Sequence, residues 1–279
     1  MPVELVWNRY GKSSVRLVKV RRSSEPHDVI DLTIDVSLEG AFDKVYTDGD
    51  NSACVATDTM KNTVYAFARR DPIEHVEAFA SRLAQHFSEK PGVSLVSIAA
   101  AEHPWTQLSA GGHPHPHAFS RAGEEDWTTV VTRTAGRTSI ASGLRGLVVL
   151  KTTGSAFSDF PRDEYTTLPE TRDRILATSI TATWQYADGF ADFSARTAVR
   201  AALVSAFAGH TSESVQQTLY AMGEAALAAC AGVTEIQLSL PNRHHLLVDL
   251  RPFGLDNPNE IFVATDQPFG LIEARIRRT

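Results

Sequence analysis

Residues 28–39 read Asp-Val-Ile-Asp-Leu-Thr-Ile-Asp-Val-Ser-Leu-Glu, and apolar and polar side chains alternate through almost the whole run. A period of two is typical of a strand that rests one face on a core, as strands of antiparallel sheets do. The run 15–20, which comes just before it, is rich in valine and leucine and is expected to supply a partner strand. These two runs predict a fold built on an antiparallel sheet.

A second decisive stretch, residues 56–63, reads Ala-Thr-Asp-Thr-Met-Lys-Asn-Thr. Apolar residues recur every three to four positions from Met60 to Ala68, which predicts an amphipathic helix. Thr57 and Asp58 then lie at its N-terminus, where either side chain can cap free backbone N–H groups and where the helix dipole favours an anion. Taken alone, this pair is most simply interpreted as an ordinary capped helix.

The remaining patterns repeat one order, strand-strand-helix-helix-strand-strand, in both halves of the chain. They indicate a second helix from Ile73 to Phe87, β segments at 93–105 and 118–133, strands at 147–151 and 176–186, helices at 194–208 and 212–230, and strands at 234–250 and 261–277. We therefore predict an α+β fold of two units, residues 1–135 and 136–279, each an antiparallel four-stranded sheet with helices on one face.

Composition excludes several classes of function. The chain has 279 residues with 27 basic and 33 acidic side chains, and this net charge of −6 offers no basic surface for nucleic acid. Its two cysteines, Cys54 and Cys230, are too far apart to suggest a disulfide framework or a thiolate metal site. No apolar run has the length of a membrane span, and neither a signal peptide nor a peroxisomal C-terminus is present. We expect a cytoplasmic protein with no membrane partner.

Polar residues interrupt two apolar faces in the second half. Arg174 shares strand parity with the apolar Leu176, so its guanidinium needs an anionic or carbonyl-rich partner. That partner can be a flat heterocyclic ligand, or it can be an acidic side chain with which the arginine forms a buried ion pair. Gln216, near a helix start, offers a donor and an acceptor. Asn242 and His244 lie two residues apart on a strand whose apolar stripe is expected to continue to Leu246. A satisfied core network is the commoner explanation of such a pair.

Several blocks of the chain resemble, in order, the sequence signatures of the urate oxidase (uricase) family. They are Tyr10-Gly-Lys12, Val55-Ala-Thr-Asp-Thr-Met-Lys-Asn-Thr-Val-Tyr-Ala66, Phe160-Pro-Arg-Asp-Glu-Tyr-Thr-Thr-Leu168, Asp173-Arg-Ile-Leu-Ala177, Ser214-Val-Gln216, Leu240-Pro-Asn-Arg-His-His245 and Gly270-Leu-Ile-Glu273. Because several blocks are long and unusual in composition, chance agreement is improbable.

The resemblance implies both an architecture and a reaction. Tandem T-fold (tunnelling fold) units would pair between subunits into a β-barrel with helices outside, in a homotetramer that is a dimer of dimers with active sites at subunit interfaces. The substrates would be urate and O2, and the products 5-hydroxyisourate and hydrogen peroxide. No metal or organic cofactor is implied, because the urate dianion itself donates electrons to oxygen.

The same resemblance assigns the residues that bind substrate. Arg174 and Gln216 would grip the edge of the purine with help from the backbone of Val215. Phe157 would stack on the ring, and Leu168 would line the pocket.

Proton transfer is assigned by the resemblance to Lys12, Thr57 and His244. A threonine hydroxyl is too weak an acid to act alone, so it needs a neighbouring base, and a lysine can serve. Asn242 and His244 would lie beside the ring where oxygen and water react, and Asp58 would join Thr57 in binding substrate.

A run of three histidines, His113-Pro-His-Pro-His117, is a separate signal. Alternate histidines on an extended segment share a face and suit transition metals. The prolines and glycines favour an exposed loop at 111–116 instead, and no carboxylate or cysteine accompanies the run. We interpret it as a loop, with metal binding the minor alternative.

Two other functions fit the same fold. One is a pterin- or purine-binding enzyme related to cyclohydrolases or aldolases. The other is a purine-binding protein without turnover.

Overall fold

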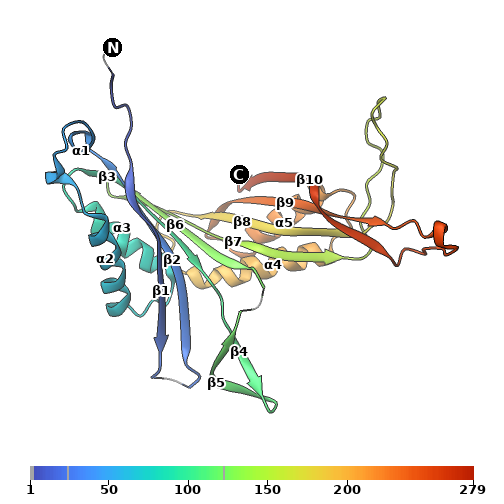
Figure 1. Cartoon of the computed structure of the whole chain (residues 1–279), viewed down its shortest axis with the longest axis horizontal. Coiled ribbons are helices and arrows are strands. Elements are labelled where there is room, and N and C mark those ends of the chain that lie inside the picture. Colours follow the sequence, from blue (N-terminus) through green and yellow to red (C-terminus); the bar gives the residue numbers. More distant parts are fainter. Residues whose placement is uncertain (1–2, 24, 122) are drawn as a thin grey trace. The chain divides into compact units, whose positions relative to one another are not determined.

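The computed structural model describes residues 3–23, 25–121 and 123–279 (Figure 1). The chain forms two compact units. The first unit runs to Gly143 and includes Gln185–Ser194, and the second contains Leu144–Trp184 and Ala195–Thr279. The division lies inside strand β7 (Arg137–Lys151). The expected boundary between residues 135 and 136 stays a prediction.

The first unit is an antiparallel sheet with helices against one face. Its strands follow the order β1 (Tyr10–Arg21), β2 (Asp28–Gly40), β3 (Val93–Glu102) and β6 (Asp126–Thr134), and its helices are α1 (Asp43–Thr47), η1 (Asn51–Ala53), α2 (Thr57–Arg70) and α3 (Val76–Ser88). The antiparallel pair predicted from residues 15–20 and 28–39 is confirmed.

Alternation along β2 separates the two faces of this sheet. Leu32, Ile34 and Leu38 have no exposed surface and share one core with α2 and α3, to which Met60 and Phe79 contribute. Thr33, Asp35 and Ser37 alternate with these apolar residues and face the other way, because successive side chains of a strand alternate. The apolar face therefore fixes how the helices lie on the sheet.

The second unit repeats the arrangement. Its strands follow the order β7, β8 (Leu176–Tyr186), β9 (Val233–Leu247) and β10 (Phe262–Arg277), and its helices are η2 (Phe193–Ala195), which begins in the first unit, α4 (Arg196–Gly209), α5 (Val215–Ala229) and η3 (Arg251–Phe253). Helix α5 contacts α4, β9 and β10. On β8, Ile180, Ala182 and Trp184 share one face and are fully buried. Of the helices in the described ranges, none is long and apolar enough to cross a bilayer.

The loop predicted at residues 111–116 is wrong. The chain leaves the main sheet after β3 and forms a separate antiparallel hairpin of β4 (Thr106–Ala110) and β5 (His113–Ser120) before it returns as β6. Gly111 and Gly112 make the turn, with φ of +61° and +81°, values that favour glycine. Pro114 and Pro116 are tolerated because β5 pairs with β4 alone in the described chain, and proline is compatible with an edge strand.

The second helix begins later than the sequence predicts. Ile73 was expected inside it, but α3 starts at Val76. Ile73 lies in the connection from α2 with φ of +53°, and its side chain is buried. The Asp71 side chain accepts a hydrogen bond from the Ile73 N–H at 2.7 Å, which holds this irregular turn and delays the helix.

Candidate active site

Lys12 occupies a fixed irregularity of β1. It lies opposite Val36 of β2, and the register shifts between Lys12 and Val15. Inside this bulge Ser14 has φ of +57°, and its N–H donates to Oδ1 of Asp35 at 2.6 Å. Gly11 is required beside it, because a Cβ there would come within 1.9 Å of the Val36 carbonyl oxygen. The bulge therefore sets where the lysine leaves the sheet.

Tyr10 fastens the segment before α2 to the same strand. Its hydroxyl accepts a hydrogen bond from the Val55 N–H at 2.8 Å, and its ring meets Phe42 edge-on at 4.9 Å. Burial raises the pKa of Tyr10 to about 12, with the neighbouring Cys54 adding to the rise. The contact joins positions 45 residues apart and brings the start of α2 close to β1.

The predicted capping by Thr57 or Asp58 is wrong. Ala56 is the N-cap residue and Thr57 is the first residue of α2, with no side chain capping the helix. The Asp58 carboxylate instead accepts hydrogen bonds from Lys61 at 2.5 Å and Asn62 at 2.9 Å, which compete with the backbone for it. Thr57 is exposed, and its hydroxyl forms no hydrogen bond within the described residues. Its hydroxyl is thus available for other contacts.

Charge links Lys12 to this corner. The pKa of Asp58 is lowered, chiefly by its hydrogen bond to Lys61 and by that lysine's charge, and Lys12 contributes the same effect more weakly. The structure therefore brings Lys12 into electrostatic range of the start of α2, where Thr57 lies.

In the second unit Arg174 stacks on Phe157. The guanidinium carbon lies 5.4 Å from the ring centroid, and the ring of Phe160 stacks on Phe157 at 4.9 Å. Nε of Arg174 is buried and has no hydrogen-bond partner in the described residues. Burial lowers the pKa of Arg174 from its ordinary value. Such a cation is short of the polar contacts that a buried guanidinium requires.

The segment that holds this pair is a small bridge ahead of β8. Phe157 exchanges two backbone hydrogen bonds with Thr171, at 2.8 and 3.0 Å. The Asp173 carboxylate accepts from the Thr153 hydroxyl and, at 2.9 Å, from the Gly154 N–H. These contacts hold the residues just before Arg174, which itself lies two positions before β8 begins.

The same segment reaches the start of α5. Ala156 N–H donates to the Ser212 carbonyl at 2.7 Å, and the Ser212 N–H donates to Gly154 at 3.0 Å. Ser214 caps α5 by accepting from the Gln217 N–H at 3.1 Å. Val215 and Gln216 follow as the first helical residues. The Val215 side chain is buried and the Gln216 side chain is exposed. Phe157, Arg174 and Gln216 are thus carried by segments bonded to one another.

Leu168 is more exposed than Phe157 and Arg174. Its side chain is 52% exposed, and its carbonyl accepts a long hydrogen bond of 3.4 Å from Arg162.

Asn242 and His244 lie where the apolar stripe of β9 ends. Leu240 and Asn242 are buried, but Leu246 is 53% exposed, so the expected continuation of the stripe to Leu246 is wrong. Asn242 lies opposite Gly270 and His244 opposite Thr265, so β10 accommodates three extra residues across this step. The bulge widens the strand pair beside these two polar side chains.

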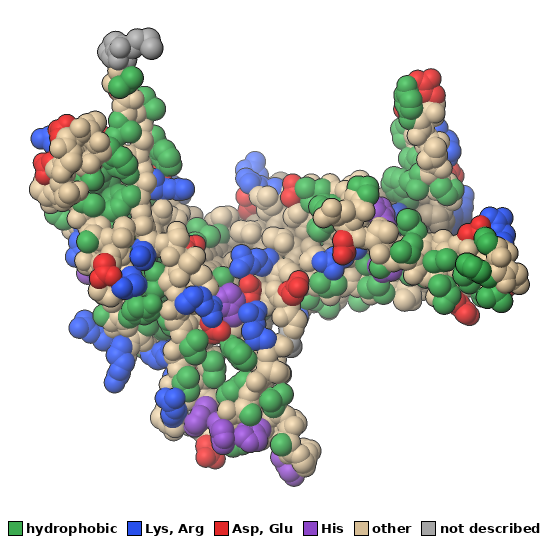
Figure 2. Space-filling view, viewed as in Figure 1, with side chains coloured by type: hydrophobic (Ala, Val, Ile, Leu, Met, Phe, Trp, Pro, Cys, Tyr) green, Lys and Arg blue, Asp and Glu red, His purple; other side chains and the backbone are tan. Residues whose placement is uncertain are grey.

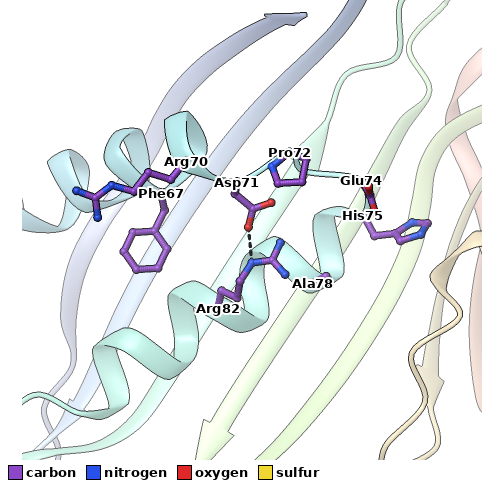
Figure 3. A pocket seen from close by; sticks show the side chains of 8 residues that line it. All are labelled: Phe67, Arg70, Asp71, Pro72, Glu74, His75, Ala78 and Arg82. Carbon is purple, nitrogen blue, oxygen red and sulfur yellow. Dashed lines mark ion pairs between the residues drawn. The ribbon is translucent and has the colours of Figure 1, made fainter.

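A cavity with a volume of about 460 Å³ lies elsewhere, between α2 and α3 (Figure 3). It is lined by Phe67, Arg70, Asp71, Pro72, Glu74, His75, Ala78 and Arg82. Its central carboxylate, Asp71, already pairs with Arg82 and accepts from the backbone at Ile73. None of the predicted site residues lines it. We therefore place the candidate site at the two side-chain groups rather than in this cavity.

Sequence reasoning missed the supporting residues. Tyr10, Asp173 and Ser214 each fasten a segment that carries or adjoins a site residue, yet no apolar period of the sequence marks them. All three lie inside matched family blocks, which is the only signal that could have found them.

Together these features define an α+β protein with a cationic, aromatic site in one unit and a lysine-threonine corner in the other. The uricase family model matches residues 8–132 and 140–273. The chain belongs to the uricase family and is an oxidoreductase that oxidises urate. The resemblance found in the sequence is confirmed, and the cyclohydrolase or aldolase alternative finds no support.

Individual relatives agree with this assignment. The chain is 49% identical to the uricase of Arthrobacter globiformis over 99% of this chain and 90% of the relative. It is 40% identical to that of Aspergillus flavus, over 97% and 96%. The crystal structure of the Arthrobacter globiformis uricase superposes with a TM-score of 0.94 at 48% identity, covering 100% of this chain and 96% of that one. A urate oxidase from Bacillus sp. TB-90 shares the fold, with a TM-score of 0.84 at 22% identity over 98% and 100%.

Proposed function

We propose that this chain converts urate, O2 and water to 5-hydroxyisourate and hydrogen peroxide with its own side chains and without a metal or organic cofactor. The observation that carries the proposal is the Arg174–Phe157 pair. A half-buried guanidinium with an unpartnered Nε, stacked on an aromatic ring, is a ready receptor for the carbonyl edge of a flat anion.

Substrate binding is assigned to the second unit. Arg174 and Gln216 hold the two ends of the purine edge, because one supplies a fixed pair of donors and the other a donor and an acceptor. Val215 is the first residue of α5, where backbone N–H groups have no partner within the helix, so its N–H is suited to donate to the ligand. Phe157 stacks on the ring, and Leu168 lines the pocket.

Proton transfer is assigned to Lys12, Thr57 and His244. Urate enters as an anion and must lose a further proton to become the reactive dianion, and Thr57 transfers that proton between substrate and Lys12. The proposal is supported by the electrostatic proximity of Lys12 to the start of α2 and by a Thr57 hydroxyl that caps nothing. Asp58 helps to hold substrate at this corner.

The reaction balances without another reagent. Urate loses two electrons and its C5 gains a hydroxyl from water, while O2 gains two electrons and two protons to become hydrogen peroxide. His244 and Asn242 are proposed to hold the oxygen and the water beside the ring, with His244 passing on protons.

We propose further that two chains build each site. Lys12, Thr57 and Asp58 belong to the first unit, and the purine-binding residues belong to the second. Strands β1 and β10 are edge strands, and each pairs on one side only in the described residues. Proteins usually cover such open sheet edges. Tandem T-fold units that close a β-barrel between subunits, in a dimer of dimers, would cover them. The two free cysteines fit a reducing cytoplasm.

One assay tests the proposed reaction. Purified protein, stripped with chelator and shown by metal analysis to be metal-free, should remove urate absorbance with stoichiometric O2 uptake and peroxide release. Binding of urate without O2 uptake would identify a purine-binding protein instead. Activity restored only by added copper or iron would contradict the cofactor-free mechanism.

A further inference from the structure

The histidine run of β5 meets a fourth histidine from another part of the first unit. His27 precedes β2, and its N–H donates to the carbonyl of Pro116 at 2.8 Å. The β4–β5 hairpin is therefore bonded to the connection between β1 and β2. Histidine side chains gather over this hairpin in the space-filling view (Figure 2).

Three of these imidazoles are neighbours. The rings of His115 and His117 lie 4.5 Å apart, and the rings of His27 and His117 lie 5.9 Å apart. His113 shares their strand, but it is exposed and no ring contact is recorded for it in the described chain. The cluster of three therefore consists of His27, His115 and His117, and His113 lies outside it.

Because the run His113-Pro-His-Pro-His117 lies on a strand and not in a loop, the directions of its side chains are fixed. In a loop the alternate histidines would point in independent directions, but on β5 residues two apart share a face. The hairpin also fixes its backbone, because Gln107 of β4 donates to the His115 carbonyl at 2.8 Å. His115 and His117 are thus held as a side-by-side pair, an arrangement that suits chelation of one ion by two imidazoles.

In this conformation the three imidazoles do not yet point at one common position. Among the described residues, no three His, Cys, Asp or Glu side chains already surround one point that could hold a metal ion. The recorded hydrogen bond on these rings is long, 3.4 Å from the His117 N–H to Nδ1 of His115, so it resists ring rotation weakly. Rotation of the His27 ring is the remaining step.

We propose that His115 and His117 chelate a divalent transition-metal ion such as Cu²⁺, Ni²⁺ or Zn²⁺, and that His27 rotates in as the third ligand. Imidazole nitrogen suits these ions, and water can complete the coordination. The bound ion would cross-link the β4–β5 hairpin to the β1–β2 connection.

This site is distinct from the urate site. Lys12 lies near one end of β1, and the connection that carries His27 begins at the other end, at Arg21. Nine residues of strand at roughly 3.3 Å each separate them by about 30 Å. Metal binding is therefore expected to leave urate turnover unchanged, and the test relies on binding itself.

The test uses the full-length, chelator-treated protein and ZnCl2 as the probe in isothermal titration calorimetry. We expect one ion per chain. His117→Gln and His115→Gln should each weaken binding by more than the roughly tenfold to hundredfold that loss of an outer-shell partner costs. His27→Gln should weaken it less, because the adjacent His115–His117 pair is left intact.

His113→Gln is the matched control, since it removes a histidine from the same strand but not from the cluster. It should bind Zn²⁺ like the parent. Wild-type protein that binds no Zn²⁺, or a His113→Gln loss as large as that of His117→Gln, would overturn the proposal. Circular dichroism and urate turnover equal to the parent's would show that the variants fold.

Discussion

The two groups of proposed site residues differ in how much water reaches them. In the first unit the Asp58 side chain is 68% exposed and Thr57 is also exposed. In the second unit Arg174 is covered so far that its Nε contacts no solvent and no partner in the described residues. An exposed hydroxyl beside cations can exchange protons, whereas a half-buried cation holds an anion firmly. The comparison predicts that the Lys12–Thr57 pair of the first unit acts chiefly in proton transfer and that the Arg174–Phe157 pair of the second unit acts chiefly in binding.

The largest effect is expected from Thr57→Ala. If the first unit moves protons, turnover should fall by about 10²–10⁴-fold, the usual contribution of acid–base groups, with urate affinity little changed. Lys12→Met should behave alike. Steady-state kinetics with a separate binding measurement, using a non-oxidised purine analogue, distinguish the two quantities.

Thr59→Ala is the control for this prediction, because Thr59 is exposed on the same first turn. It should keep normal turnover. A loss of affinity in Thr57→Ala as large as its loss of turnover would remove the distinction between the two units.

Arg174→Ala is expected to act mainly on binding. Removing one partner of a half-buried charged contact costs about 2–5 kcal/mol, so KM should rise by roughly 30-fold or more. Arg174→Lys should not restore affinity, because an ammonium cannot reproduce the planar fork.

The matched control is Arg172→Ala, which removes an exposed arginine two residues away. It should leave KM unchanged. A fall in turnover at unchanged KM in Arg174→Ala would place the arginine in the chemical step instead.

Mixing variants tests whether two chains share each site. Thr57→Ala and Arg174→Ala chains, allowed to reassort, form mixed dimers with one doubly damaged site and one intact site. A random mixture should recover roughly a quarter of normal activity. Thr57→Ala mixed with Lys12→Met should recover nothing, because both lesions lie in the same unit. No recovery in the first mixture, despite proven exchange, would place the whole site within one chain.

Sequence patterns predicted the elements that have one apolar face. The alternation of β2 and β8 follows directly from burial on one side, and it identified both strands. It failed at residues 111–116, where glycine and proline suggested a loop, because a two-residue turn and an edge strand accept the same residues. Local pattern also could not show that Lys61 and Asn62 take the Asp58 carboxylate away from the backbone.

The site residues could be predicted from sequence patterns less completely than the fold. Arg174 is conspicuous in the sequence as a charge on an apolar face, but Phe157 and Gln216 carry no such mark. Their association depends on the backbone bonds of Ser212 and Thr171, which join positions far apart in the chain. Roles for these residues came from the family resemblance, and only the variants above can test them.

The smallest effect is expected at Tyr10, which positions the proton-transfer corner without belonging to it. Because its folded pKa is raised to about 12 from 10.0, the stability it contributes is fully present below pH 10. That stability is lost as pH rises through about 12, since the unfolded chain releases the proton first. Urea unfolding midpoints measured at pH 9 and pH 11 should therefore fall less in Tyr10→Phe than in the parent.

Lysines also titrate in this range, so the difference between the two proteins is the informative quantity. Tyr165→Phe is the control, because that side chain is 81% exposed and should follow the parent. If Tyr10→Phe and the parent lose equal stability between these two pH values, burial does not raise the pKa of Tyr10, and the hydroxyl does not occupy the buried position beside Val55.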